Sequence, residues 1–322
     1  MIGELSPNAL RQQVVFHHSC GAMGTRFSMV LPGVDAITGA DLAELAESHL
    51  RLQERLMSRF DASSPVSELN RRAAEEAVAV PPALWTILVQ CRNHWRRTRR
   101  AFDITQWPLN KLWREHVGCG EEPSDEVIRE ARGRTGMERI CFDETARTLK
   151  LEVDGMSLDL GGIGKGIALE GLAEEFRQRG VESAFLSFGE SSVTVIGSHP
   201  HGPAWPVGIA NMLHPETAAH TFSLRDASLS TSGTTPFNET GGPQNLGHII
   251  NPRDGRPIAG YRTLSVTAPS AIDAEVLSTA LLVIPEVERA DILAGYPGAA
   301  AIEMVYERHN NFMPRVQWKY ET

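Results

Sequence analysis

The chain has 322 residues, 42% of them hydrophobic and 22% charged, with a formal net charge of −9 at pH 7. This length can bury a substantial core in one large domain or two lobes, and the composition is ordinary for a soluble globular protein. The acidic balance argues against a general nucleic-acid-binding protein, since that function normally needs a basic surface. No stretch approaches the roughly 20 apolar residues of a membrane-spanning helix.

The N-terminal stretch MIGELSPNALRQQVVF contains an early glutamate, no apolar run of signal-peptide length and no lipobox. We therefore expect a cytoplasmic protein, with a trimmed export signal as the open alternative. The four cysteines are widely spaced, without a CxxC pair or a cysteine–histidine spacing typical of zinc. They are expected to be reduced thiols without a function: Cys20, Cys91, Cys119 and Cys141.

The first predicted elements are two strands and two helices. Residues 14–33 alternate apolar with polar or small residues on either side of a glycine turn, which is typical of a hairpin. Leucine and alanine recur at helical spacing over 41–60. A second helix should begin near Pro82, with Trp85, Leu88, Val89 and Trp95 on its apolar face. Its arginines fit either a solvated face or a positive rim for a phosphorylated ligand: Arg92, Arg96, Arg97, Arg99 and Arg100.

The second half of the chain alternates short strands with helices. A β-meander is predicted over 140–160, with Asp154-Gly155 as its hairpin turn. A helix is predicted after the glycines of 161–166, with Leu169, Leu172, Ala173 and Phe176 inward, and it ends near Gly180. Further elements are a strand–turn–strand unit over 184–197, a loop over 198–205, two or three strands through 222–229, 248–250 and 264–268, and a helix over 271–284. This order predicts an α+β fold rather than a doubly wound parallel sheet. No linker divides the chain, so we expect a single domain over 1–322, or two intertwined lobes.

The glycine-rich stretch LDLGGIGKGIALEGLAEEF, residues 158–176, is not a standard phosphate motif. A P-loop would need glycine where Asp159 stands and Ser or Thr where Gly166 stands, and the GxGxxG spacing of dinucleotide-binding folds is absent. Glycines nevertheless let backbone approach a ligand, and a helix N-terminus offers free N–H groups to an anion. By itself the stretch leaves a phosphate site and a tight strand-to-helix turn both open.

Its first part and four other stretches form an ordered set of five: GAMGTRFSMV (21–30), FDITQWPLNKLW (102–113), LDLGGIGKG (158–166), HIINPRDGRP (248–257) and SVTAPSAIDAEVLSTALLV (265–283). Together they resemble the ApbE family of FAD:protein FMN transferases, whose members carry MGT, FDIT-x-x-P, LDLGGIAKG, HIIDPRTGRP and A-x-x-ADALATA in that order. SRFDASSPVSELNR (58–71) is similar to a family segment ending in SELxRxN. Each motif is short, but the set covers the chain from about residue 21 to residue 284.

The resemblance implies a flavin transferase fold of mostly antiparallel sheets with flanking helices, which holds FAD in a cleft between two lobes. It implies that a threonine or serine hydroxyl of a target protein attacks the FMN-side phosphorus of FAD, so that FMN becomes phosphoester-linked and AMP leaves. Mg²⁺ suits such phosphoryl chemistry. The implied acceptor presents a short Asp/Ser-Gly-Ala-Thr/Ser-like segment, and no nucleic-acid partner is expected.

The implied metal ligands come from two motifs. The carbonyl of Gly164 matches the alanine of GGIAKG; Glu275 and Thr279 match the aspartate and threonine of ADALATA, and Ser278 lies beside them. Glu275 and Thr279 are four residues apart and share a helix face. Glutamate in place of aspartate is a departure, because Mg²⁺ is strict about geometry. Asp273 would face away. Outside this context, a surface acid and a capping hydroxyl would be the ordinary interpretation of the pair.

The implied flavin contacts are spread over the other motifs, and they are Met23, Phe60, Ala101, Phe102, Asp103, Gly161, Lys165, Ile167 and Ile249. Asp103 can accept hydrogen bonds from ribose hydroxyls or the adenine amino group, or it can cap a turn. Phe60 can stack on the isoalloxazine where relatives often carry tyrosine, and Ile167 also replaces a tyrosine. Lys165 and Arg253 can pair with phosphate.

His248 is the candidate catalytic base, because imidazole accepts a proton near neutral pH; a structural histidine in a strand is the alternative. The HxH pair of His199 and His201 is interpreted as part of a polar loop rather than as a metal site. Two further functions stay open beside the transferase: an FAD pyrophosphatase that gives FMN and AMP, and a non-catalytic FAD-binding or carrier protein whose metal site is lost through Glu275.

Overall fold

The computed structural model describes residues 14–118, 121–189, 191–211, 217–234, 249–307 and 313–321. Its main sheet has eight strands in the order β1-β2-β6-β7-β10-β11-β12-β13, and every neighbouring pair is antiparallel. Their bounds are β1 Val15–Ala22, β2 Thr25–Pro32, β6 Ala184–Phe188, β7 Ser192–Ile196, β10 Ser228–Thr234, β11 Tyr261–Ala268, β12 Ala300–Tyr306 and β13 Pro314–Tyr320. The predicted α+β class with mostly antiparallel sheets is confirmed.

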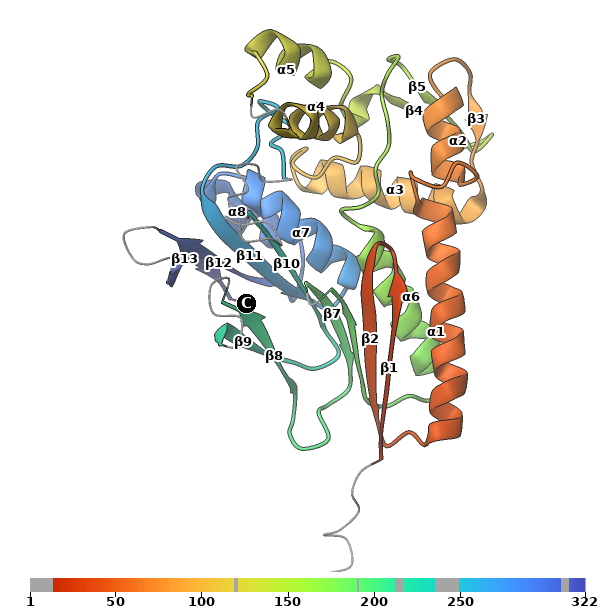
Figure 1. The fold of residues 1–322 in the computed structure, drawn as a ribbon, viewed down its shortest axis with the longest axis vertical. Coiled ribbons are helices and arrows are strands. Elements are labelled where there is room, and N and C mark those ends of the chain that lie inside the picture. The colour runs from red at the N-terminus through yellow and green to blue at the C-terminus, as the bar shows by residue number, and fades with distance from the viewer. Residues whose placement is uncertain are drawn as a thin grey trace, which may run out of the picture.

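Two small antiparallel sheets accompany the main one. One contains β3 Val78–Ala79, β5 Thr148–Leu151 and β4 Ile140–Asp143, and the other pairs β8 Trp205–Ala210 with β9 Ala218–Leu224. The helices are α1 Ala36–Met57, α2 Pro65–Arg72, α3 Pro82–Arg97, α4 Trp107–Gly118, α5 Asp125–Arg132, α6 Gly164–Gln178, α7 Ala271–Val283 and α8 Glu286–Leu293, with a 3₁₀ turn, η2, at Met137–Arg139. Figure 1 shows α1 along one side of the molecule, beside the β1–β2 hairpin. Within the described ranges, no helix has the length and apolar character to cross a bilayer.

Helix α7 is the centre of the fold. Its apolar residues are spread around the helix beside four polar ones, and nearly every residue of it is buried, as expected of a helix enclosed on most sides. It packs on β10 and β11 and crosses α6 (Figure 1). One core joins α7 with α3 and the 101–104 segment, and a second core fills the space between α1, α6 and the β1–β2 hairpin. The N-terminus of α6 therefore lies where these two cores meet.

Several predicted elements match the structure closely because local signals define their ends. The β1–β2 hairpin turns at Met23-Gly24, whose positive φ angles of 50° and 74° are those of a tight two-residue turn. Pro82 opens α3 in a first-turn position. Ser270 caps α7 by accepting the Asp273 N–H, and Gly180, with φ of 77°, follows α6.

Other predictions were wrong in detail. The helix predicted over 41–60 begins at Ala36, since the Asp35 carboxylate caps the N–H groups of Ile37 and Thr38. The hairpin turn in 140–160 is not Asp154-Gly155. It follows Asp143, whose carboxylate accepts the N–H groups of Thr145 and Ala146.

The predicted strand over 222–229 is two strands. β9 ends at Leu224 and β10 begins at Ser228, and Asp226, with φ of 46°, lies in the turn between them. The chain after α8 contains β12 and β13, which were not predicted from the sequence.

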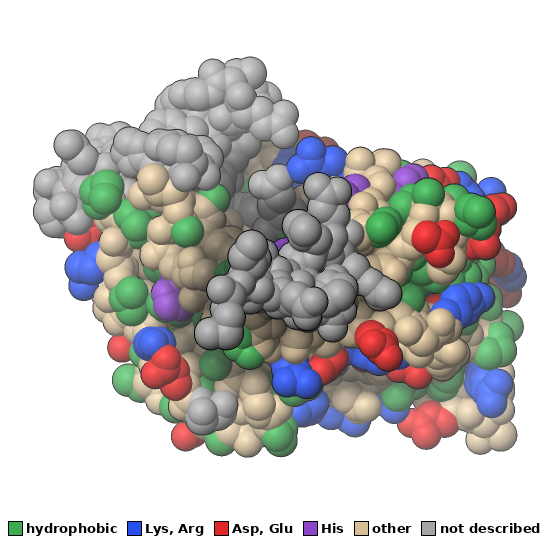
Figure 2. Space-filling view, turned by 90° about the horizontal axis from the view of Figure 1, so that it is seen from below, with side chains coloured by type: hydrophobic (Ala, Val, Ile, Leu, Met, Phe, Trp, Pro, Cys, Tyr) green, Lys and Arg blue, Asp and Glu red, His purple; other side chains and the backbone are tan. Residues whose placement is uncertain are grey.

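Acidic partners lie near four of the five arginines in and just after α3: Arg92, Arg97, Arg99 and Arg100. Arg92 pairs with Glu144, and Arg99 pairs with Glu288 and Asp291. This favours the interpretation as a solvated face. On the side of the molecule in Figure 2, basic and acidic side chains are interspersed and do not gather by sign.

Candidate active site

A cavity of about 560 Å³ lies at the N-terminus of α6, between the 101–107 segment, β10 and α7. Its volume is within the range of small-molecule sites. It brings together predicted residues from four separate motifs: Ala101, Phe102, Asp103, Gly161, Lys165, Ile249, Glu275 and Thr279. Apolar walls with a few convergent polar groups are the usual composition of a binding pocket.

The remaining predicted residues lie elsewhere. Gly164, Ile167 and Ser278 are buried and do not line the cavity, and the half-buried Met23 places its methyl group 3.1 Å from the point that a Cβ on Gly164 would occupy. Phe60 is 80% exposed and lies outside the cavity, with the Arg59 guanidinium 4.0 Å from its ring centre. His248 falls outside the described residues.

The first turn of α6 binds the carboxylate of Glu275. The Lys165 ammonium lies 2.5 Å from Oε1, and the Gly166 N–H donates to Oε2. A Cβ on Gly166 would lie 2.7 Å from the Ala271 carbonyl oxygen and 2.9 Å from Oε2, so α6 and α7 can approach this closely only at glycine. Glu275 is 3% exposed, so these donors replace the water that its charge has lost.

A cluster of hydroxyl groups extends from Glu275 along α7. Ser278 Oγ donates to the Glu275 carbonyl and lies 2.8 Å from Ser232 Oγ, which in turn lies 3.0 Å from Thr279 Oγ1. Ser230 Oγ lies 3.2 Å from Ser278 Oγ. Ser230 and Ser232 are two apart on β10 and so face the same side of the sheet. Sequence reasoning missed both, although this alternation was a signal for them.

Asp103 both caps a turn and lines the cavity. One carboxylate oxygen accepts the Thr105 N–H at 2.8 Å and its hydroxyl at 2.6 Å, and the other accepts the Met137 N–H at 3.3 Å. Burial nevertheless raises the pKa of Asp103 to about 6, because desolvation of the charged form outweighs these hydrogen bonds. The hydrogen bonds from Thr105 and Met137 show that Asp103 caps a turn, which was the alternative interpretation of this residue.

Two polar side chains of the cavity lack partners. Neither the amide oxygen nor the amide nitrogen of Gln106, nor the Ser192 hydroxyl, has a hydrogen-bond partner among the described residues, although all are buried. Both residues line the cavity. Buried polar groups are normally satisfied, so a polar ligand that these side chains can turn toward, such as a nucleotide with its sugar and phosphate oxygens, would supply the missing partners.

The rim of the cavity is held by Arg59. Its guanidinium lies 3.2 Å from the ring centre of Trp107, and its Nε lies 2.9 Å from Asp159, a carboxylate that also accepts the Gly161 N–H. Asp159, at the position where a P-loop would need glycine, therefore anchors the glycine turn to the rim.

The groups around Glu275 are mainly oxygen donors. Glu275 and Thr279 face the cavity, and the hydroxyl cluster adds further oxygens, which are the ligands that Mg²⁺ prefers. Lys165 shares the carboxylate in this structure. The residues present therefore fit the ion, on condition that Lys165 moves from Glu275.

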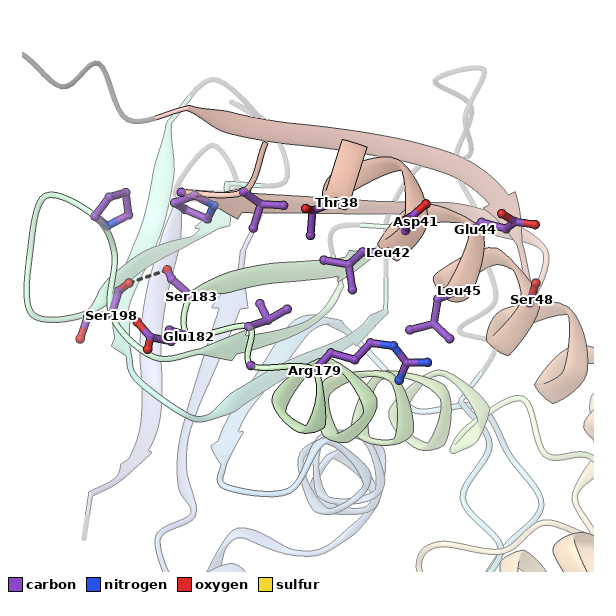
Figure 3. Close-up of a pocket in the computed structure, with 16 residues that line it drawn as sticks. Thr38, Asp41, Leu42, Glu44, Leu45, Ser48, Arg179, Glu182, Ser183 and Ser198 are labelled. Carbon is purple, nitrogen blue, oxygen red and sulfur yellow. Dashed lines mark hydrogen bonds between the residues drawn. The ribbon is translucent and has the colours of Figure 1, made fainter. Parts of the chain in front are cut away.

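A larger hollow of about 990 Å³ lies at the opposite end of α6, between the start of α1 and residues 179–183. Figure 3 shows it, with Thr38, Asp41 and Arg179 among its lining residues. It contains none of the predicted site residues. We therefore place the candidate active site in the smaller cavity, where the predicted motifs converge.

Known proteins are similar to this chain over most of its length. The model of the ApbE family matches residues 23–302. An FAD:protein FMN transferase of Escherichia coli K12 is 30% identical over 291 residues, which are 85% of this chain and 81% of that protein. One from Klebsiella pneumoniae is 28% identical over 297 residues, which are 88% and 83% of the two chains.

Solved structures share the fold. The flavin transferase ApbE from Vibrio cholerae superposes with a TM-score of 0.76 at 22% identity and covers 96% of this chain and 97% of its own. The apo flavinyl transferase ApbE of Pseudomonas stutzeri gives a TM-score of 0.76 at 24% identity, covering 92% of each chain.

Proposed function

Because the chain belongs to the ApbE family, to which its match over residues 23–302 assigns it, we propose that it transfers FMN from FAD to a threonine or serine hydroxyl of a target protein. The transfer depends on Mg²⁺. The observation that carries the proposal is the convergence of Asp103, Lys165, Glu275 and Thr279, from three separate motifs, on one cavity with unpartnered polar groups.

The reaction is a phosphoryl transfer between oxygens. The acceptor hydroxyl oxygen bonds to the FMN-side phosphorus as the bond from that phosphorus to the AMP-side bridging oxygen breaks, and AMP leaves with that oxygen. The hydroxyl proton passes to a base, for which His248 remains our prediction. Such chemistry needs chiefly positioning of the groups and neutralisation of negative charge.

The residues of the cavity divide this work. Lys165, at the N-terminus of α6, pairs with the pyrophosphate, where the helix dipole also favours negative charge. Gln106 and Asp103 bind polar groups of the nucleotide, and Phe102 and Ile249 supply apolar surface for its rings. Glu275 and Thr279 would hold Mg²⁺ at the cavity wall, where the ion would neutralise charge on the transferred phosphoryl group. The Gly164 carbonyl and Ser278, which do not line the cavity in this structure, are the further ligands that the family resemblance implies.

Lys165 and Glu275 are coupled in this scheme. When the ammonium group pairs with the pyrophosphate, it leaves the Glu275 carboxylate with the Gly166 N–H and open to a cation. Binding of the nucleotide would then free the Glu275 carboxylate for the metal ion in the same step. The buried carboxylate would never be left without a positive partner.

A second candidate function is a non-catalytic FAD carrier. It is favoured by one observation: both oxygens of Glu275 already have donors, from Lys165 and Gly166. An FAD pyrophosphatase, with water in place of the acceptor hydroxyl, would use the same site.

The proposal also includes a cytoplasmic location, which cell fractionation tests. It further includes an acceptor protein with a short Asp/Ser-Gly-Ala-Thr/Ser-like segment.

Incubation of the protein with FAD and Mg²⁺, with and without such an acceptor, separates the three functions. A transferase releases AMP in the presence of the acceptor and leaves a flavin bound to it after denaturation. A pyrophosphatase releases AMP and free FMN in both samples. A carrier binds FAD and leaves it intact, and either of the last two results would overturn the proposal.

A further inference from the structure

The inward face of β1 presents two metal-binding side chains to α1. Alternate residues of β1 are half-buried, and among them Phe16 lies against Gly39 of α1, with ring atoms 2.3 Å from the point a Cβ there would occupy. His18 and Cys20 follow Phe16 on the same face, because side chains of a strand alternate. Figure 1 shows β1 and α1 side by side. His18 and Cys20 therefore meet the next turns of the helix, where Glu47 lies.

The three side chains converge on one point. A ring nitrogen of His18, the thiol sulfur of Cys20 and a carboxylate oxygen of Glu47 all lie within 4.8 Å of one another, and His18 Nε2 is 3.0 Å from Glu47 Oε1. In the part of the chain that the structure describes, no other group of three or more His, Cys, Asp or Glu side chains lies close enough together to bind a metal ion. None of the three lines the flavin cavity.

We propose that His18, Cys20 and Glu47 bind Zn²⁺, with water as the fourth ligand. Nitrogen, sulfur and oxygen from His, Cys and Glu are the donors that zinc uses in proteins, and the soft thiolate disfavours Mg²⁺ and Ca²⁺. Zinc bonds of about 2.0–2.3 Å place tetrahedral ligand atoms about 3.3–3.7 Å apart. Small side-chain rotations bring the three atoms to that spacing.

The surroundings leave the required oxygen available. Arg51 donates to Glu47 Oε2 at 3.0 Å, which holds the carboxylate and leaves Oε1 facing His18. A His18–Glu47 ion pair would connect β1 and α1 without a metal, but it needs no thiol, and Cys20 adds a third donor at the same point. Burial, and to a smaller extent the charge of Glu47, raises the pKa of the Cys20 thiol. At neutral pH a cation therefore has to displace the thiol proton. This inference departs from the expectation that the cysteines have no function.

Co²⁺ is the most direct probe, because a cobalt–thiolate bond gives a charge-transfer band that no carboxylate or imidazole ligand produces. Protein without an affinity tag should show this band with one equivalent of Co²⁺, and Zn²⁺ should abolish it by displacement. Cys20→Ser should remove the band. The matched control is Cys141→Ser. Cys141 is an exposed thiol whose Sγ also lies near a carboxylate, 3.1 Å from a Glu152 oxygen, and this variant should leave the band unchanged.

His18→Gln and Glu47→Gln should each weaken Co²⁺ binding at least about 10-fold, which is the lower range for loss of even an outer metal-site partner. Glu47 lies at the surface of its helix, so its variant tests the site even where a β1 variant fails to fold. Absence of the band in the unaltered protein, its persistence in Cys20→Ser, or unchanged affinity in both other variants would each overturn the proposal. All these readouts are independent of flavin transfer.

Discussion

The ammonium nitrogen of Lys165 lies 2.5 Å from Oε1 of Glu275, a residue 110 positions further along the chain. Lys165 is the second residue of α6 and Glu275 the fifth of α7, so the contact joins the glycine-rich motif to the proposed metal site at the cavity. In the proposed function, lysine and Mg²⁺ would therefore be alternative partners for one buried carboxylate.

This competition predicts that Mg²⁺ stabilises one variant of the pair and leaves the other unchanged. Lys165→Met leaves the Glu275 charge with the Gly166 N–H alone and should lower the free energy of unfolding by about 1–3 kcal/mol. Mg²⁺ should restore much of that loss, because it replaces the missing cation. Glu275→Gln keeps the side-chain shape, removes the charge and should show no Mg²⁺-dependent stabilisation.

Thermal unfolding with and without Mg²⁺ measures both effects without any assay of activity. The unaltered protein should respond less than Lys165→Met, since its lysine competes with the ion. Equal responses in Lys165→Met and Glu275→Gln would show that the ion does not bind at Glu275.

Gly166 is predicted to tolerate no side chain. Gly166→Ala places a methyl group against the Ala271 carbonyl and the Glu275 carboxylate, which forces α6 and α7 apart and should cost about 1–3 kcal/mol of unfolding free energy. The matched control is Gly21→Ala, where a Cβ would have no neighbour within 4 Å. Urea unfolding of both variants checks this, and similar stability for the two would contradict the close helix crossing.

Elements with strong local signals could be predicted from the sequence, and these hold the site. The glycine turn and the caps place α6 and α7 to within a residue or two of their observed ends. β12 could not be recognised, because most of its residues are buried and its sequence lacks the alternation of a half-exposed strand. α5 has only eight residues, too few for a helical period, although Ser124 and the acids after it were a usable N-terminal signal.

Residues of the candidate site could be predicted only where they belong to a family motif. Asp103, Lys165, Glu275 and Thr279 follow from the resemblance, and the structure places all four on one cavity. The Lys165–Glu275 contact could not be foreseen, because no spacing rule connects residues that far apart in sequence. Ser232 likewise meets α7 only after β10 and α7 pack together.

Replacing Gln106 with leucine should weaken FAD binding without destabilising the protein. Its buried amide lacks a partner among the described residues, so Gln106→Leu removes an unsatisfied group and should leave the ligand-free protein equally stable or more so. If FAD supplies the partner, the same change should weaken FAD binding roughly 5- to 15-fold, or about 1–1.5 kcal/mol. Fluorescence titration with FAD and urea unfolding measure the two quantities. A stability loss with unchanged affinity would mean that the amide serves the fold alone.

His94 should make the protein sensitive to acid. It is 6% exposed, lies 3.2 Å from the Tyr296 hydroxyl, and burial lowers its pKa from 6.5 to about 4, with a smaller effect from the Arg97 charge. Between pH 6.5 and 4 the unfolded chain binds a proton that the folded chain refuses, so stability falls as pH falls through this window. The loss is at most about 3.5 kcal/mol, at 1.4 kcal/mol per pKa unit.

His94→Gln isolates this contribution, because glutamine can still accept the Tyr296 hydroxyl and does not titrate. Asp103 and Asp273, whose pKa values are raised by burial, act in the opposite direction and are common to both proteins. The fall in unfolding free energy from pH 7 to pH 4.5 should be smaller in His94→Gln. Parallel curves would show that His94 is not buried neutral.

The most direct test of the central claim is the intact mass of an acceptor protein after incubation with FAD, Mg²⁺ and this protein, with AMP measured in the same sample. We predict that the acceptor gains the mass of one FMN unit for each AMP released, and that Glu275→Gln gives neither product while it still binds FAD. An unmodified acceptor beside bound, intact FAD, or full labelling by Glu275→Gln, would contradict the account.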